Sequence, residues 1–253
     1  MNSECKYQKK LSAISYWLLA FVFCSCHKAP LCDCIDSAGS QATITKNLGF
    51  FNQIYVKDNI NVYITIGSPE TITVEGGSNL IKNIETDVNN GILSMKNNNI
   101  CNWLRSYKKS VINVYITMPE LNTVTNAGYG TVYSRGTLAV DSLVLNTVNS
   151  SGDFDLNVNC NYINAHMFGT ADLTLTGYAK TFSTNFFGGT GFIYNNNLET
   201  GYTFVSSSTT GDCYVNADSA LVVEIFGEGD VYYKGNPAIS YFPKGGSGKL
   251  VKD

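Results

Sequence analysis

The sequence predicts an all-β protein: a right-handed parallel β-helix (a solenoid) of about 20 residues per coil with a β-rich N-terminal cap. Two observations carry this prediction. Only 15% of the 253 residues are charged, whereas Gly (23) and Tyr (16) are frequent, and such a composition favours strands and tight turns over helices. In addition, a glycine-centred turn recurs through the second half of the chain at intervals of about 18–22 residues, as a solenoid requires.

The recurring turn keeps three features in register. The turn residue is Gly130, Gly152, Ala171, Gly191, Gly211, Gly229 and Gly248. Two positions later stands an apolar residue: Val132, Phe154, Leu173, Ile193, Cys213, Val231 and Leu250. Seven to nine positions before the turn residue stands another: Leu121, Leu143, Ile163, Phe182, Tyr202, Leu221 and Tyr241.

Equivalent positions of successive coils stack at the spacing of neighbouring strands, so both apolar sets are predicted to form interior ladders. The turn glycine is explained either by an unusual backbone dihedral angle or by a lack of room for a Cβ atom. The right-handed sense follows from the general chirality of parallel β-connections.

The first residues have the features of a lipoprotein signal peptide, residues 1–25. Three lysines lie among the first ten residues, and the apolar stretch 11–23 has the length of a signal-peptide core and is short for a membrane span. We expect Cys26, which follows a small residue, to become the first mature residue and to carry the lipid. The alternatives are lipidation at Cys24, an ordinary secretory peptide cut nearby, or an uncleaved anchor.

The remaining chain divides into three parts. Residues 26–48 are polar and patternless, as expected of a tether. Residues 49–118 contain short β-rich runs separated by turn residues, and we expect them to cover the open N-terminal end of the solenoid. Residues 119–253 form the coils, and residues 246–250 resemble an incomplete last coil.

The order of several short motifs resembles a known family. These are FNQI at 51–54, VEG at 74–76, GIL at 91–93, VYITMPEL at 114–121 and FGEGDVYYKGNP at 226–237. Together they resemble the domain called "putative auto-transporter adhesin, head GIN domain". The resemblance implies a β-helical fold, export and frequent lipid anchoring, and it transfers no catalytic residue.

An acidic residue follows the turn residue in four coils: Asp153, Asp172, Asp212 and Asp230. In the solenoid Asp153 would stack on Asp172, and Asp212 on Asp230. Stacked carboxylates repel each other, and a bound calcium ion would offset that repulsion with these oxygens as ligands. The alternative is that each carboxylate accepts N–H groups within its own turn. No other cofactor is implied.

Two aromatic groups are candidates for ligand binding. Trp103, Arg105 and Tyr107 lie in an irregular segment and would form a patch for a sugar or a partner protein, unless Trp103 plugs the end of the core. A second group would form outward rows usable by glycans, or consist of ordinary strand tyrosines: Tyr129, Tyr133, Tyr178, Tyr214, Tyr232 and Tyr233.

The sequence contains no convergent catalytic constellation. His166 stands alone on an expected strand, and no nucleophile-elbow, zinc-protease or phosphate-loop motif occurs. We therefore predict an exported, lipid-anchored, non-enzymatic protein with an adhesin-like or envelope-scaffold role. The alternative is a carbohydrate-active enzyme, a polysaccharide lyase or hydrolase, which would need an acidic cluster and a basic partner in one groove.

The expected location is the cell envelope of a Gram-negative bacterium, on the periplasmic or the outer side of the membrane. The expected partners are the membrane, through the N-terminal lipid, and a glycan or an envelope protein. A net charge of −3 gives no basic face for nucleic acid, so no nucleic-acid partner is expected.

Overall fold

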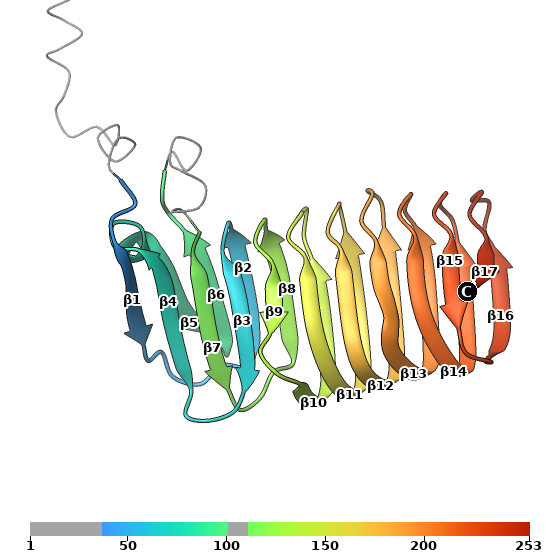
Figure 1. Ribbon diagram of the computed structural model, residues 1–253, viewed down its shortest axis with the longest axis horizontal. Coiled ribbons are helices and arrows are strands. Elements are labelled where there is room, and N and C mark those ends of the chain that lie inside the picture. Colours follow the sequence, from blue (N-terminus) through green and yellow to red (C-terminus); the bar gives the residue numbers. More distant parts are fainter. Residues whose placement is uncertain (1–36, 101–110) are drawn as a thin grey trace, which may run out of the picture.

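In a computed structural model, which describes residues 37–100 and 111–253, the chain forms an elongated β-solenoid (Figure 1). One continuous sheet contains the strands β1 (Gln41–Lys46), β2 (Gln53–Asp58), β3 (Asn61–Ile66), β4 (Thr71–Gly77), β5 (Ile84–Asn89), β6 (Ile92–Asn97), β7 (Asn113–Met118), β8 (Thr123–Gly128), β9 (Val132–Ser134), β10 (Leu138–Thr147), β11 (Phe154–Phe168), β12 (Leu173–Phe187), β13 (Ile193–Ser208), β14 (Cys213–Ile225), β15 (Val231–Lys234), β16 (Ala238–Pro243) and β17 (Leu250–Lys252). A short 3-10 helix, η2 (Ile81–Asn83), follows β4. The predicted all-β solenoid is confirmed.

The sheet wraps around the core as two faces. The first face has the strand order β1-β4-β7-β3-β9, followed by the first halves of β11 to β14 and then by β15 and β17. The second face has the order β5-β6-β2-β8-β10, followed by the second halves of β11 to β14 and by β16. Each long strand thus crosses both faces, with a bend in the middle, and the glycine turn joins it to the next coil.

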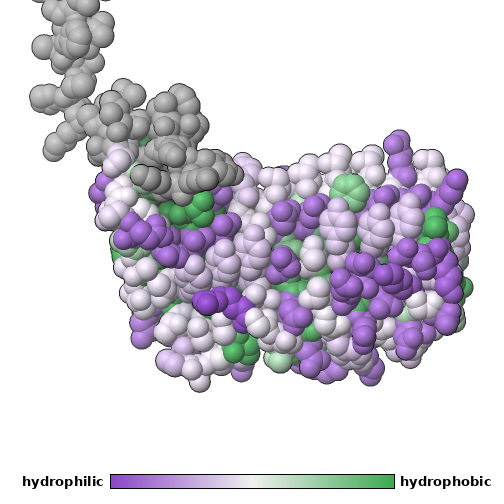
Figure 2. All heavy atoms as spheres, viewed as in Figure 1, coloured by the Kyte–Doolittle hydropathy of each residue, from purple (hydrophilic) through white to green (hydrophobic). Residues whose placement is uncertain are grey.

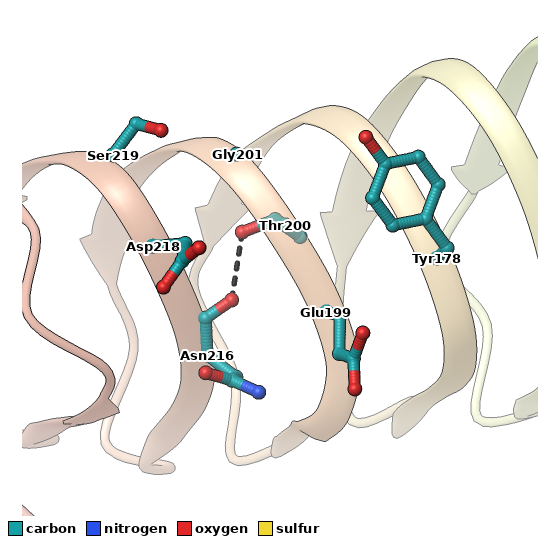
Figure 3. A pocket seen from close by; sticks show the side chains of 7 residues that line it. All are labelled: Tyr178, Glu199, Thr200, Gly201, Asn216, Asp218 and Ser219. Atoms are coloured by element: carbon teal, nitrogen blue, oxygen red, sulfur yellow. Dashed lines mark hydrogen bonds between the residues drawn. The ribbon is translucent and has the colours of Figure 1, made fainter.

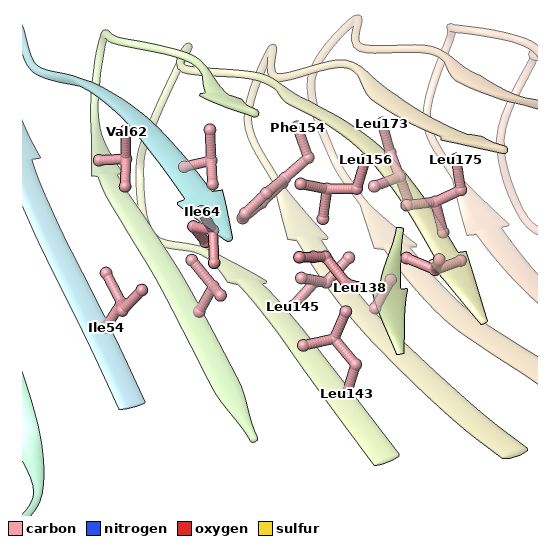
Figure 4. Close-up of a cluster of buried hydrophobic side chains, with 14 of the residues drawn as sticks. Ile54, Val62, Ile64, Leu138, Leu143, Leu145, Phe154, Leu156, Leu173 and Leu175 are labelled. Atoms are coloured by element: carbon pink, nitrogen blue, oxygen red, sulfur yellow. The ribbon is translucent and has the colours of Figure 1, made fainter. Parts of the chain in front are cut away.

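The first predicted ladder is confirmed in full. Val132 pairs with Phe154, and the register continues through Leu173, Ile193, Cys213, Val231 and Leu250. All but Leu250, which lies in the last half-coil, are at most 1% exposed. Figure 4 shows Phe154, Leu173 and their neighbours pointing into the interior. This apolar contact, repeated from coil to coil, is the core that holds the solenoid together.

The second predicted ladder holds only in part. It runs through Leu143, Ile163, Phe182, Thr203, Leu221 and Ile239. Tyr202, expected inside, pairs with Thr181 and is 44% exposed, so the interior position belongs to Thr203. Tyr241 pairs with Val223 in a different interior column and is 37% exposed, because no further strand covers β16.

The N-terminal region is part of the solenoid and not only a cover. β2 and β3 pair in parallel with β8 and β9, so they continue the two faces directly. Beyond them β4, β1 and β5 add in antiparallel orientation. Residues 41–46, which the sequence assigned to the tether, form β1, because their alternating pattern lets Ala42 and Ile44 pack against the core.

The turn glycines leave no room for a Cβ atom. A Cβ on Gly191 would lie 2.2 Å from the carbonyl oxygen of Ala171, and a Cβ on Gly211 would lie 1.8 Å from that of Gly191. Both distances are far below van der Waals contact, and neither glycine has a positive φ. Of the two explanations from the sequence, close approach of successive coils is therefore the one that applies here.

Candidate functional site

The turn aspartates connect neighbouring coils. Asp153 Oδ1 accepts the backbone N–H of Asp172 at 2.8 Å, and Asp172 Oδ1 accepts that of Phe192 at the same distance. Asp212 Oδ1 accepts the N–H of Asp230 at 2.8 Å, and Asp230 Oδ1 accepts that of Lys249 at 2.7 Å. Each carboxylate thus bonds to the equivalent position one coil later, and not within its own turn as one expectation had it.

This arrangement gives the aspartates a structural role. Over residues 37–100 and 111–253, no three His, Cys, Asp or Glu side chains come close enough to hold a metal ion. Burial, and secondarily the charge of Asp172, raises the pKa of the Asp153 carboxyl, while the N–H of Asp172 opposes the increase. The calcium site expected at Asp153, Asp172, Asp212 and Asp230 therefore gains no support from the geometry.

A column of outward side chains crosses the first face. We call its six aromatic members the tyrosine column: Tyr115, Tyr63, Tyr133, Tyr194, Tyr214 and Tyr232. Their backbone positions lie in one continuous register, with Asp155 and Thr174 between the two sets of three. Tyr63 stacks on Tyr115 and on Tyr133 with ring centroids 5.0 Å apart. Tyr214 stacks on Tyr194 at 5.9 Å and on Tyr232 at 4.9 Å.

The pKa values of five phenol groups of this column, those of Tyr63, Tyr115, Tyr194, Tyr214 and Tyr232, are raised. Tyr115 donates a hydrogen bond of 2.7 Å to Glu75 on β4, and this bond is the main cause that raises the pKa of Tyr115 to about 12. Partial burial, followed by the nearby turn aspartates, raises the pKa values of Tyr194, Tyr214 and Tyr232. The column therefore presents the outward edges of its stacked rings together with hydroxyl groups that both donate and accept hydrogen bonds.

A hollow of about 400 Å³ opens at the bend between the two faces, over β12, β13 and β14 (Figure 3). We call it the bend hollow, and it is lined by Tyr178, Glu199, Thr200, Gly201, Asn216, Asp218 and Ser219. Tyr178, Glu199 and Asp218 are exposed, and no basic residue is among the lining. Within the described ranges, the two carboxylates form no hydrogen bond or ion pair. They are free acceptors beside an accessible aromatic ring.

Irregular register creates the bend hollow. The pairing of β13 with β14 shifts between Asn195 and Glu199 and again between Thr200 and Tyr202. Asp218 and Ser219 consequently project at the bend, while Gly201 opposite contributes no side chain. Thr200 donates a hydrogen bond of 2.7 Å to the carbonyl oxygen of Asn216, which links β13 to β14 within the hollow (Figure 3). Sequence periodicity missed Glu199, Gly201 and Asp218, although the unequal lengths of these coils were a visible signal.

The other candidate residues are distributed as follows. Cys26, Trp103, Arg105 and Tyr107 lie outside the described residues. Tyr129 is 69% exposed at a turn, whereas Tyr233 packs against the core instead of facing outward. His166 lies at the surface between Asn164 and Asn185, with no carboxylate among its hydrogen-bond partners. The aromatic residues that the structure gathers are those of the tyrosine column and Tyr178.

The two described cysteines are interior residues. Cys160 and Cys213 are unpaired and buried, and burial raises their thiol pKa values to about 11 and about 12. Such thiols remain protonated and unreactive near neutral pH. Cys213 is a small apolar side chain of the first ladder, and Cys160 lies between Val140 and Ala179 in another interior column.

A further hollow of about 300 Å³ lies near the N-terminal end. Its lining includes Tyr55, Lys57, Glu85, Asp87 and Lys96, so it carries charges of both signs. The Lys57 ammonium group lies 5.3 Å from the centre of the Tyr55 ring. In the view of Figure 2 the surface is mainly hydrophilic to neutral, with hydrophobic residues in small separate patches. None of the helical structure among the described residues is long and apolar enough to cross a bilayer.

Several solved structures share this fold. A crystal structure of a "putative adhesin" from Bacteroides fragilis has 24% identity and a TM-score of 0.74, and the match covers 85% of this chain and 97% of that one. A "putative adhesin" from Parabacteroides distasonis has 18% identity and a TM-score of 0.65, over 85% and 98% of the two chains. A "putative lipid binding protein" from the same species has 19% identity and a TM-score of 0.62, over 87% and 99%. At these identities the likeness concerns the fold alone.

Sequence comparison identifies the family. No curated protein matches the chain. A family model does match, over residues 50–237, which include β2 to β15 and therefore the tyrosine column and the bend hollow. The chain belongs to the family described as "Putative auto-transporter adhesin, head GIN domain".

Proposed function

We propose that this protein is an exported, lipid-anchored, non-enzymatic binding protein of the cell envelope, and that it holds glycans in the manner of an adhesin. The observation that carries the proposal is the tyrosine column, which places stacked rings and hydroxyl groups along one face of a rigid solenoid. The family description and the names of the structural neighbours support an adhesin-like role at the cell surface or in the envelope.

The chemistry of the column suits sugars. Because the rings stack on one another, the column offers a ligand its outward ring edges and its hydroxyl groups, which can donate to and accept from sugar hydroxyl groups. Spacings of 4.9–5.9 Å between neighbouring ring centroids repeat along the coils, so a linear glycan can meet several equivalent contacts in succession.

The anchor follows from the N-terminal sequence. Acyl chains on Cys26 would hold the protein on a membrane, because each buried methylene group contributes about 0.8 kcal/mol. The chain from residue 27 to β1 would then connect the lipid with the N-terminal end of the solenoid.

The lyase alternative has weaker support at the bend hollow. Its chemistry needs a basic group beside the acidic residues, and the lining of this hollow, which includes Glu199 and Asp218, contains no Lys, Arg or His. The hollow near the N-terminal end does combine Glu85 and Asp87 with Lys57 and Lys96. At the bend hollow, binding therefore fits the geometry better than elimination chemistry does.

A glycan array tests the proposal. The full-length protein in detergent is applied as wild type, as Tyr194→Ala/Tyr214→Ala and as the control Tyr162→Ala, which removes a tyrosine of the second face that is 42% exposed. We expect selective binding by the wild type, loss of at least about tenfold in affinity for the double variant, and no change for the control. No binding by the wild type to any glycan would contradict the proposal.

A further inference from the structure

We infer that the bend hollow binds one unit of a neutral sugar, as the selective end of a glycan site that continues onto the tyrosine column. This inference rests on the proposed function and names its ligand class and its selective residues. It is carried by four features of the hollow: an aromatic platform, free acceptors, the sign of its charge, and its position beside the column.

The platform is Tyr178. Its side chain projects from β12 at the bend and is 46% exposed, so one ring face is open to a ligand (Figure 3). Gly201, on the neighbouring strand β13, contributes no side chain to the hollow beside the ring. A hollow of about 400 Å³ falls within the size range of small-molecule sites, roughly 300–1,000 Å³.

The acceptors are the carboxylates of Glu199 and Asp218. A carboxylate with both oxygens free accepts two hydroxyl groups at once, and such charge-assisted bonds are about twice as strong as neutral ones. The Asn216 amide adds a donor and an acceptor in the same hollow. This combination of acceptors suits the adjacent hydroxyl groups of a sugar.

The charge of the lining selects against acidic sugars. Two carboxylates and no basic side chain line the hollow, so a uronic acid or a sulfated sugar would be repelled. A small cation would also be attracted by these charges, but it would use neither the open ring face for stacking nor the amide donor of Asn216. A neutral sugar uses the carboxylate acceptors, the open ring face and the amide donor together.

The hollow adjoins the tyrosine column. Asn216 follows Tyr214 by two residues on β14, and both side chains face outward. Two residues of strand extend roughly 7 Å at about 3.3 Å each, so a glycan with one unit in the hollow can place its next units on the column.

Isothermal titration calorimetry on the full-length protein in detergent tests the inference. The probes are neutral hexasaccharides of glucose, galactose and mannose, a hexagalacturonate and spermidine. The variants are Tyr178→Ala and Glu199→Gln/Asp218→Asn in the hollow and Tyr214→Ala in the column. Tyr162→Ala and Glu120→Gln, which change exposed residues outside both the hollow and the column, are the matched controls. Melting temperatures verify that every variant is folded.

We expect at least one neutral hexasaccharide to bind with an affinity that added salt does not change, and each hollow variant to weaken it at least about tenfold. The control variants should bind the neutral hexasaccharide with wild-type affinity. The hexagalacturonate should not bind to the wild type. Binding of spermidine alone would overturn the inference. So would sugar binding that Tyr214→Ala abolishes but the hollow variants leave intact, an outcome that keeps the proposed function. Absence of sugar binding by the wild type would refute both.

Discussion

At the scale of single residues, the turn glycines show how closely successive coils approach. The Cβ of an alanine at position 211 would overlap the carbonyl oxygen of Gly191, so the two coils would have to separate. We therefore expect Gly211→Ala to lower the free energy of unfolding by about 1–3 kcal/mol, the usual cost of overpacking. Chemical denaturation measures the change.

Gly67→Ala is the matched control. A Cβ at position 67 would meet only the Thr117 methyl group at 3.5 Å, which is ordinary contact. This variant should change the free energy of unfolding by less than about 1 kcal/mol. Equal effects of the two substitutions would show that the coils do not approach as closely at Gly211 as the structure has them.

The turn aspartates give a prediction about pH. Burial raises the folded-state pKa of Asp153 above its unfolded value near 3.8. The stability from this group is therefore fully present below pH 3.8 and is lost as the pH rises through the folded-state pKa. Asp153→Asn keeps the Oδ1 acceptor for the N–H of Asp172 and removes the charge. It should melt at a higher temperature than the wild type at pH 7 and at the same temperature near pH 3.

Scanning calorimetry measures the melting temperatures across this pH range. The control is Asp155→Asn, which changes an exposed aspartate two residues further along, on β11. A gain in melting temperature that persists at pH 3 would show that it does not come from the charge of Asp153. A loss at pH 7 would show that the ionised form stabilises the fold.

At the scale of elements, the periodicity of the sequence predicts the first ladder correctly but misplaces the residue that the irregular strand β13 contributes to the second. The ladder from Val132 to Leu250 follows from the sequence because it starts at a turn residue and lies two positions beyond it, before any irregularity accumulates. The second ladder lies beyond the bend, where the register shift of β13 against β12 displaces the chain by one residue. Residue spacing alone therefore placed Tyr202 inside, where the structure has Thr203.

A pair of substitutions tests this correction. Thr203 is fully buried beside Phe182 and Leu221, so Thr203→Asp would place an unpaired charge in the core and cost on the order of 3–5 kcal/mol. Tyr202→Ala removes an exposed ring and should cost less than about 1 kcal/mol. Urea denaturation measures the free energy of unfolding of both variants. A larger loss for Tyr202→Ala than for Thr203→Asp would favour the register predicted from the sequence.

The N-terminal elements and the bend hollow were not predictable for a related reason. Residues 49–118 carry no repeat, and β3 pairs with β9 some seventy positions later, a contact that no local pattern reveals. Glu199 and Asp218 look like ordinary surface residues in the sequence, since only the irregular register brings them into one hollow with Tyr178. Three members of the column, Tyr133, Tyr214 and Tyr232, were predicted from the sequence as outward residues. Tyr63, Tyr115 and Tyr194 were missed, and Tyr233 was wrongly included.

At the scale of the whole molecule, the solenoid provides a long rigid face. The tyrosine column extends from β7 to β15, so contacts far apart in the sequence lie along one line. Sites repeated along such a line can bind a polymeric ligand more tightly than any single contact allows. Lipid attachment near the N-terminal end of the solenoid would place this line on the membrane surface.

The most direct test of the account is the capture of protein-bearing vesicles on an immobilised neutral glycan. Full-length protein from a host that processes lipoproteins is mixed with phosphatidylethanolamine–phosphatidylglycerol vesicles, as wild type and as Cys26→Ser. The account predicts that the wild type retains vesicles on the glycan, and that Cys26→Ser binds the glycan while the vesicles wash away. Wild-type protein that binds the glycan but retains no vesicles, or vesicles retained equally by both proteins, would contradict it.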